Sequence, residues 1–249
     1  MPPSLPRLYG ELAGWYHLLT APHEYIEEAA IYRDAFWEAV VPAPRTMLEL
    51  GCGGGCNAFH LKRDFVCTLT DVSPQMLDVS RSINPECEHA LGDMRTLRLG
   101  RQFDVVLVHD AVAYMTTEED LRRTMETAFV HCRPGGAALF APDFVRETFR
   151  PATDSGGNDD GDRGLRYLEW CREPDPDATT YVVDYAYLLR EGNDVRVVHD
   201  RHVEGLFSRF VWNSGLEAAG FRVTKVGRLA PANPEEIGEI FVAVRPARS

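Results

Sequence analysis

The chain has 249 residues, of which 45% are hydrophobic and 26% charged, as expected for a globular protein of one large domain or one domain with a smaller appended element. Its formal net charge of -12 disfavours binding to nucleic acids and to anionic membranes. No apolar run reaches about 18 residues and no basic segment precedes an apolar stretch near the N-terminus, so neither a membrane span nor a signal peptide is expected. Six cysteines without an export signal indicate reduced thiols and a cytoplasmic location.

The first 44 residues are predicted to be helical and are rich in aromatic side chains. Tyr32 and Phe36 have helical spacing, which favours a helix packed on a core. Tyr9 and Tyr16 precede this regular helix. We interpret residues 1–44 as a helical lid in which these two tyrosines cover a binding site.

From residue 46 to residue 140, predicted strands and helices alternate. Strands are expected at 46–50, 66–70, 88–91, 103–108 and 137–140. Ser73 followed by Pro74 is typical of a helix start, and Thr117 is suited to cap the next helix. Apolar strands that alternate with helices are typical of a parallel sheet covered on both faces. The carboxyl ends of such strands share one edge, where ligands bind.

The composition changes after Phe149. Residues 153–162 are polar and glycine-rich, and we expect a mobile loop there. Alternating segments at 166–171, 181–189 and 195–203 predict a three-stranded antiparallel meander over the edge of the sheet. A helix over 208–219 that ends before Gly220, and strands at 222–229 and 239–244, complete the chain.

The predicted fold class is therefore α/β. It consists of a Rossmann-like, seven-stranded, mostly parallel sheet with helices on both faces, plus the antiparallel meander over the active-site edge. We assign residues 45–145 and 205–249 to the core, and residues 146–204 to an inserted part that binds substrate.

A glycine cluster follows the first strand, in the segment Glu49-Leu50-Gly51-Cys52-Gly53-Gly54-Gly55. Glycines between a strand and a helix let a ligand approach the backbone closely. Counted from Gly51, the sixth residue is Cys56, where the dinucleotide-binding fingerprint requires glycine or alanine. Glu49 would repel a pyrophosphate but suits a cationic amine. The loop therefore favours a ligand other than a dinucleotide.

Two further acids follow the next two strands. Asp71 lies about 20 residues after the loop, where a carboxylate binds a ribose diol. Asp93 is placed to accept a hydrogen bond from an adenine amino group, with Met76 and Met94 packing on the ring. An amine, a ribose and an adenine without phosphates together describe S-adenosylmethionine.

These motifs, followed by Pro134-Gly135-Gly136 before the fifth strand, resemble those of class I S-adenosylmethionine-dependent methyltransferases over residues 46–140. The resemblance implies a methyltransferase with S-adenosylmethionine as its cofactor. Two alternatives remain open: another nucleotide-binding α/β protein, and a sensor or scaffold that binds the cofactor without turnover. The cofactor contacts that the resemblance implies are Tyr9, Glu49, Gly51, Cys52, Gly53, Asn57, Asp71, Val72, Met76, Asp93, Met94 and His109.

Cys52 and Cys56 also raise the alternative of an iron–sulfur enzyme that cleaves S-adenosylmethionine to radicals. Such a site needs a third cysteine two residues further on, and that position is Phe59. No metal site is predicted, and we interpret both cysteines as small residues in a tight turn.

The methyl acceptor is expected beyond the fourth strand, in the segment from His109 to Tyr114. The catalytic candidates are Tyr114, expected to line the acceptor pocket, His109, and Tyr16 folding over from the N-terminus. A structural role for His109 is equally favoured. Strand alternation predicts that His109 and Asp110 point in opposite directions, so that only one faces the acceptor.

Other polar residues of the second half have weaker functional signals. We interpret His199 and His202, in the meander, as solvated or structural. An arginine cluster near the expected loop either binds a phosphate or carboxylate or forms a solvated charged face; it comprises Arg146, Arg150, Arg163 and Arg166.

The layout of the whole chain is similar to that of bacterial N-methyltransferases that act on amino sugars carried on nucleotides. The shared features are the aromatic lid, Pro142-Asp143-Phe144 after the fifth strand, the meander, and Leu206-Phe207 before a helix. This resemblance implies a small-molecule acceptor of the amino-sugar type in natural-product biosynthesis, with a homodimer as an open option. Those enzymes often have a histidine near the position of Tyr114, so a hydroxyl acceptor remains the alternative.

Overall fold

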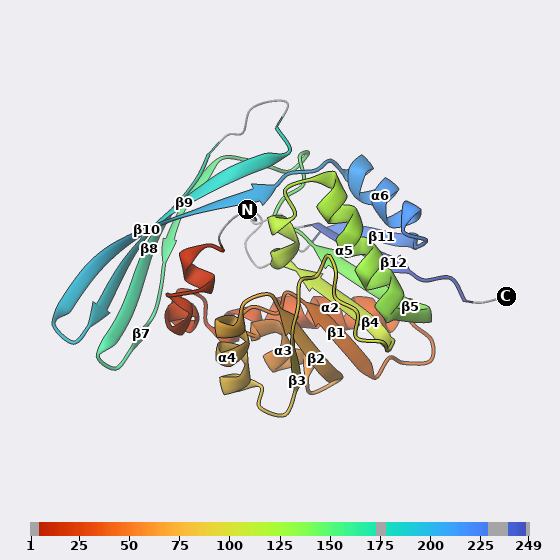
Figure 1. Cartoon of the computed structure of the whole chain (residues 1–249), viewed down its shortest axis with the longest axis horizontal. Coiled ribbons are helices and arrows are strands. Elements are labelled where there is room, and N and C mark those ends of the chain that lie inside the picture. Colours follow the sequence, from red (N-terminus) through yellow and green to blue (C-terminus); the bar gives the residue numbers. More distant parts are fainter. Residues whose placement is uncertain (1–4, 173–177, 229–238, 248–249) are drawn as a thin grey trace.

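Two sheets organise the chain, which the computed structural model describes over residues 5–172, 178–228 and 239–247 (Figure 1). The larger sheet has seven strands in the order β11-β12-β5-β4-β1-β2-β3. All its pairings are parallel except the two that β12 makes, with β5 and β11. The predicted mostly parallel sheet is confirmed. Its strands are β1 (Thr46–Leu50), β2 (Val66–Asp71), β3 (Glu88–Leu91), β4 (Phe103–His109), β5 (Cys132–Ala141), β11 (Arg222–Arg228) and β12 (Glu239–Val244).

Helices cover both faces of this sheet, as expected. One face packs against α2 (Ile26–Ala39), α3 (Cys56–Leu61) and α4 (Pro74–Ile83), and the other against α5 (Glu118–His131) and α6 (Arg209–Ala218). Successive strand residues point to opposite faces, so Met47 lies in the first core and Leu48 in the second. No helix in the described ranges is long and apolar enough to cross a membrane.

The predicted helix starts are confirmed. The Ser73 hydroxyl accepts the backbone N–H of Met76 at 3.1 Å, and the Thr117 hydroxyl accepts that of Asp120 at 3.1 Å. Gly220 follows α6 with φ +102°, a conformation that favours glycine. The cap at Ser73 places the first turn of α4 directly after Asp71, beside the glycine cluster.

The second sheet, which we call the meander, is antiparallel and extends away from the core (Figure 1). Its strand order is β10-β9-β8-β6, and β7 pairs with β8. The expected mobile loop at 153–162 is wrong, because most of that segment forms β6 and β7 against β8. Polar side chains suit an exposed edge strand, and the Tyr167 hydroxyl donates to Asp154 there at 2.8 Å. The meander consists of β6 (Ala152–Gly156), β7 (Asp159–Asp160), β8 (Arg163–Arg172), β9 (Thr180–Glu191) and β10 (Asp194–Gly205).

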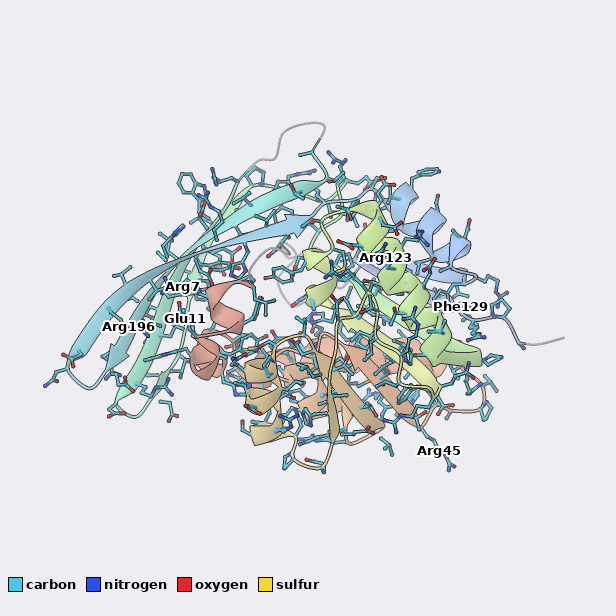
Figure 2. All side chains as sticks on the ribbon, viewed as in Figure 1. Arg7, Glu11, Arg45, Arg123, Phe129 and Arg196 are labelled. Atoms are coloured by element: carbon cyan, nitrogen blue, oxygen red, sulfur yellow. The ribbon has the colours of Figure 1, made fainter. Side chains whose placement is uncertain are left out.

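Residues 5–25, here called the N-terminal segment, run between the two sheets before α2 begins. The segment is a series of short helices: η1 (Arg7–Tyr9), η2 (Ala13–Trp15), α1 (Tyr16–Leu19) and η3 (Pro22–Tyr25). Figure 2 shows Arg7 and Glu11 on it, beside the meander. Apolar side chains of the segment, Leu12 and Trp15 among them, are buried against Leu165 and Tyr187 of the meander. The segment is therefore packed on the meander and faces the carboxyl edge of the large sheet.

Candidate active site

The glycine cluster connects β1 to α3 at the carboxyl edge of the large sheet. Gly51 has φ +78°, and a Cβ there would lie 2.4 Å from that of Ala111. A Cβ on Gly54 would lie 2.4 Å from Cδ1 of Tyr16. A distance below 3 Å is far inside van der Waals contact. The loop is therefore covered closely from both sides, and only glycine fits at these two positions.

Asp71 ties this loop to the start of α4. Its Oδ2 accepts the backbone N–H of Gly53 at 2.9 Å, and its Oδ1 accepts that of Ser73 at 2.8 Å. Burial raises the pKa of Asp71, and backbone hydrogen bonds from Ser73, Gly53 and Val72 oppose that rise. Each carboxylate oxygen retains a lone pair, so the side chain can still accept from a diol. Val72, the next residue, is 47% exposed at the same edge.

Glu49 is the acid in the core of the site. Its side chain is 2% exposed, and Oε2 has no hydrogen-bond partner among the described residues. Burial raises the pKa of Glu49 to about 8. A buried carboxyl oxygen without a partner is costly, and a cationic group beside it would provide the missing interaction. This atom therefore indicates a ligand that carries a positive charge.

Asp93 is bound by Arg95, a neighbour whose role has no signal in the sequence. Arg95 pairs with both of its carboxylate oxygens, with Nη2 2.6 Å from Oδ2 and Nε 3.0 Å from Oδ1. Hydrogen bonds from Arg95 lower the pKa of Asp93. Met94 and the fully buried Met76 lie beside the glycine cluster, where a Cβ on Gly51 would be 2.7 Å from the methyl of Met94. Adenine packing between the two thioethers remains a prediction.

His109 joins three elements. Its Nε2 lies 3.1 Å from the Glu28 carboxylate of α2 and 2.7 Å from Asp110, and its Nδ1 lies 3.2 Å from the Asn57 amide of α3. Burial lowers the pKa of His109, but the carboxylates of Asp110 and Glu28 outweigh it and raise the pKa well above the usual value. His109 therefore connects β4 to α2 and α3, and its catalytic role remains a prediction.

The expectation that His109 and Asp110 point in opposite directions is wrong. Asp110 has φ +27°, which ends strand geometry and begins η4 (Asp110–Tyr114). The reversal brings its carboxylate to the imidazole, and its side chain is still 49% exposed. Both side chains therefore belong to the same site.

Tyr114 is the centre of a hydrogen-bonded chain. Its hydroxyl lies 2.8 Å from that of Tyr9 and 2.7 Å from Nδ1 of His202. His202 Nε2 lies 3.3 Å from Oδ2 of Asp200, and Asp200 accepts the backbone N–H groups of residues 7 and 8 at 3.1 and 2.9 Å. The chain therefore links η4, the meander and the N-terminal segment.

The two meander histidines differ. His199 is exposed and pairs with Asp184 at 2.8 Å, which confirms the solvated interpretation. His202 is 2% exposed and bonded on both ring nitrogens, so of the two alternatives it is not the solvated one. The period-two alternation of β10 puts the two histidines on opposite faces, and no other sequence signal separates them.

Carboxyl groups gather around the tyrosine hydroxyls. Asp143, which follows β5, has a side-chain hydrogen bond with Asp110. Glu204 of β10 is 6% exposed and accepts the hydroxyl of Tyr181. Burial raises the pKa of both Asp143 and Glu204. Neither Asp143 nor Glu204 was a candidate site residue from the sequence, because they come from elements distant from Asp110 and from each other.

Tyr16 covers the glycine cluster rather than the Tyr114 hydroxyl. Its oxygen would lie 3.5 Å from a Cβ on Gly53, and burial raises its pKa well above the usual value. The neighbouring His17 lies 3.1 Å, through Nε2, from the backbone oxygen of Gly54. The tyrosine is therefore placed to enclose a ligand at the loop, and its catalytic role remains a prediction.

The cysteines and arginines have other contacts. Cys52 and Cys56 are free and buried, and burial raises the pKa of Cys56 to about 12, so neither is a ready thiolate ligand. Three of the four clustered arginines have partners elsewhere in the chain: Arg146 bonds the backbone oxygen of Ala178, Arg163 lies over Trp15, and Arg166 pairs with Asp159. These contacts hold the inserted part together.

Comparison with known proteins decides the family. A family model described as "Methyltransferase domain" matches residues 47–136. The dTDP-3-amino-3,4,6-trideoxy-alpha-D-glucopyranose N,N-dimethyltransferase of Streptomyces venezuelae is 30% identical over 204 residues, which cover 80% of this chain and 84% of the relative. The chain belongs to the S-adenosylmethionine-dependent methyltransferases.

Solved structures agree with the fold. DesVI of Streptomyces venezuelae has a TM-score of 0.81 at 26% identity, over 95% of this chain and 98% of DesVI. CalS10, an amino pentose methyltransferase from Micromonospora echinaspora solved with S-adenosylmethionine, has a TM-score of 0.76 at 22% identity, over 92% and 96% of the two chains. The second likeness supports the fold alone.

The site fits the cofactor of this family, S-adenosylmethionine. The free Oε2 of Glu49 matches its amine, Asp71 retains lone pairs for its ribose, and the space left by Gly51 and Gly54 would be filled by any side chain. When bound, S-adenosylmethionine supplies a methyl group already activated by a positively charged sulfur. The protein is thus a methyltransferase, and its Glu49, Asp71 and glycine cluster fit the donor.

Proposed function

We propose that this enzyme methylates the amine of a small amino sugar carried on a nucleotide. The observation that carries the proposal is the group of carboxyls around Tyr9, whose hydroxyl bonds that of Tyr114: Asp110, Asp143 and Glu204. An amine is a hydrogen-bond donor that is positively charged in water, and carboxyls stabilise both features. The 30% identity to an amino-sugar N,N-dimethyltransferase supports the same acceptor class.

The residues of the chain would act mainly by placement. The acids hold the amine beside η4, and Tyr9 and Tyr114 accept or donate hydrogen bonds to the sugar. The N-terminal segment, which packs on the glycine cluster through Tyr16, excludes water from the reacting atoms. Such placement supplies up to about 7–11 kcal/mol of a displacement barrier when the reacting atoms are aligned.

A substrate panel tests the proposal. Purified enzyme is incubated with S-adenosylmethionine and dTDP-linked 3-amino and 4-amino sugars, with the matching hydroxyl sugars as controls, and products are identified by mass spectrometry. We expect mass gains of one or two methyl groups on the amino sugars alone. Methylation of the hydroxyl sugars with equal efficiency, or no turnover of any amino sugar, would contradict the proposal.

A charge-removing variant tests the role of the acids. Asp143→Asn should raise the KM for the amino sugar by about 10-fold or more, since a hydrogen bond to a charged group contributes about 1.5–3 kcal/mol. Asp64→Asn, at an exposed position, is the matched control and should leave KM unchanged. An unaltered KM in Asp143→Asn would remove the carboxyls from the acceptor site.

The setting and assembly of the enzyme follow from the same proposal. A cytoplasmic location is supported by six free cysteines. A homodimer is supported by large apolar side chains on the outer face of the meander, among which Leu168, Trp170 and Val197 are 52–70% exposed. Sedimentation analysis of Trp170→Glu tests it, because a charge on that face should shift a dimer to monomer.

A further inference from the structure

We propose that Asp200, His202 and Tyr114 form a proton-accepting chain for the methyl acceptor. In this proposal the Tyr114 hydroxyl receives a proton from the acceptor amine while it passes its own proton to Nδ1 of His202. The inference rests on the proposed function, because it requires an acceptor that carries an amine.

The polarity of the chain follows from its last member. Asp200 is a carboxylate that already accepts the backbone N–H groups of Arg7 and Leu8, and its Oδ2 also faces Nε2 of His202 at 3.3 Å. A carboxylate only accepts hydrogen bonds, so Nε2 carries the proton of the neutral imidazole and Nδ1 has a lone pair.

The direction of the remaining bonds is then determined. Tyr114 donates its hydroxyl proton to Nδ1 of His202 across 2.7 Å. Its oxygen accepts the hydroxyl proton of Tyr9 across 2.8 Å and retains a lone pair. That lone pair is the acceptor available to an N–H group of the substrate. A tyrosine alone would be a poor base, and the imidazole behind it provides the basicity.

Acidic side chains lie around the His202 ring. Oε1 of Glu204, on the same strand, lies 3.8 Å from Nδ1, and Asp200 lies on the opposite side. Glu169 of β8 is a third acid that faces the ring. Three tyrosines of the described ranges also lie beside the ring, with ring centroids 4.8 to 5.9 Å away: Tyr9, Tyr114 and Tyr185.

The reaction balances with these groups alone. The acceptor ammonium first gives a proton to the Tyr114 oxygen while the Tyr114 proton moves to His202, which frees the nitrogen lone pair. That lone pair forms the bond to the methyl carbon, and the electrons of the carbon–sulfur bond return to sulfur. The methylated nitrogen carries the positive charge, and His202 returns its proton to solvent before the next turnover. A second methylation requires this deprotonation again.

The decisive variant is His202→Asn, because the asparagine side-chain oxygen can occupy the place of Nδ1 and accept from Tyr114 but cannot take up a proton at neutral pH. We expect kcat at pH 7 to fall by about 100- to 10,000-fold, the range for loss of a general base. The dissociation constant of S-adenosylmethionine should not change. Raising the pH should recover part of kcat, since the free amine then deprotonates in solution.

His199→Asn is the matched control, since His199 lies on the same strand but on the exposed face. It should leave kcat, KM and the pH profile unchanged. A His202→Asn enzyme with the kcat and pH profile of the wild type would overturn the inference. Absence of turnover in the wild type with every amino sugar would instead overturn the proposed function.

A second measurement is independent of the acceptor and of variant folding. Nitrogen-15 NMR of histidine-labelled wild-type enzyme reports which ring nitrogen carries the proton. The His202 signal is assigned as the one that is missing from the His202→Asn spectrum. If that variant does not fold, the signal is assigned as the one that shifts in Tyr114→Phe. We expect a proton on Nε2 of the neutral ring. A proton on Nδ1 would overturn the chain, because Tyr114 could then not donate to it.

Discussion

The carboxylate of Asp71 and the backbone N–H of Gly53 are joined by a hydrogen bond of 2.9 Å, so the residue expected to bind the ribose also holds the shape of the glycine cluster. The second oxygen of Asp71 holds the start of α4 in the same way. Binding residue and binding loop are therefore one structural unit, and a change in one is transmitted to the other.

Asp71→Asn should weaken S-adenosylmethionine binding by about 10- to 150-fold, which corresponds to loss of one charge-assisted hydrogen bond of about 1.5–3 kcal/mol. Titration calorimetry measures this directly. Asp78→Asn, on the exposed side of α4, is the control. Equal affinity in the wild type and Asp71→Asn would show that the ribose is held elsewhere.

Binding of the cofactor should release a proton at pH 7. The pKa of Glu49 is raised to about 8 by burial, so the free enzyme holds a proton there at pH 7, and the cationic amine favours the ionised carboxylate. Affinity should therefore rise from pH 6 towards pH 8. Calorimetry in buffers of different ionisation enthalpy measures the proton released.

Two controls accompany the proton measurement. Glu49→Gln removes the titrating group, so its binding of S-adenosylmethionine should release no proton. The analogue 5′-methylthioadenosine lacks the amine, so its binding to the wild-type enzyme should release none either. An apparent binding enthalpy that is the same in every buffer for wild-type enzyme and cofactor would disprove the role given to Glu49.

Gly54→Ala should displace the N-terminal segment from the glycine cluster. The added methyl would lie 2.4 Å from Cδ1 of Tyr16 and 3.0 Å from Nε2 of His17, contacts that cost about 1–3 kcal/mol. In a Tyr16→Ala background the same change should cost much less. Gly14→Ala is the control, since its Cβ meets no atom within 4 Å. Strict additivity of the Gly54 and Tyr16 changes in urea unfolding would argue against the contact.

Glu28→Gln should lower the free energy of unfolding by about 1.5–3 kcal/mol, because it leaves the buried His109 with one charged partner fewer. The pKa of His109 is raised in the folded state, against desolvation, by Asp110 and Glu28. The contribution of protonated His109 to the free energy of unfolding is therefore fully present below about pH 6.5. It is lost as the pH rises through the raised pKa of His109 in the folded state. The pKa of Glu28 is lowered in the folded state, by His109 against desolvation, so its contribution is lost at low pH.

The difference between wild type and Glu28→Gln should thus be largest between about pH 4.5 and 6.5. Urea unfolding across this range and up to pH 9 provides the measurement. Glu27→Gln, one residue earlier and exposed, should have no comparable effect. A stability difference that grows steadily above pH 7 would show that the ion pair between Glu28 and His109 does not have the expected pH dependence.

The large sheet could be predicted from the sequence because its signals are local. Strands such as 46–50 and 88–91 are short runs bounded by proline, glycine or acids, and the structure has them at those same residues. The strands β6 and β7 of the meander could not be predicted. Residues 152–160 have a composition typical of a loop, and they form strands only because β8 offers hydrogen-bond partners.

The residues proposed to hold the cofactor could be predicted from the sequence for the same reason, since Glu49, Gly51 and Asp71 have a recognisable spacing within one stretch of chain. The residues proposed for the acceptor could not, because Asp143 follows β5 while His202 and Glu204 come from β10, and no spacing records that convergence. The positive φ of Asp110, which reverses its side chain, also has no sequence signature.

The Asp200 carboxylate makes two sets of contacts. It faces His202, and it accepts the backbone N–H groups of residues 7 and 8 in the first turn of the N-terminal segment. Undocking of that turn would expose the donor and misalign the imidazole in a single event. In the proposed proton-accepting chain, enclosure of the donor and alignment of His202 would therefore be gained and lost together. Such an arrangement would limit reaction of the methyl donor with molecules other than the acceptor, because Asp200, His202 and Tyr114 are aligned only while the N-terminal segment covers the site.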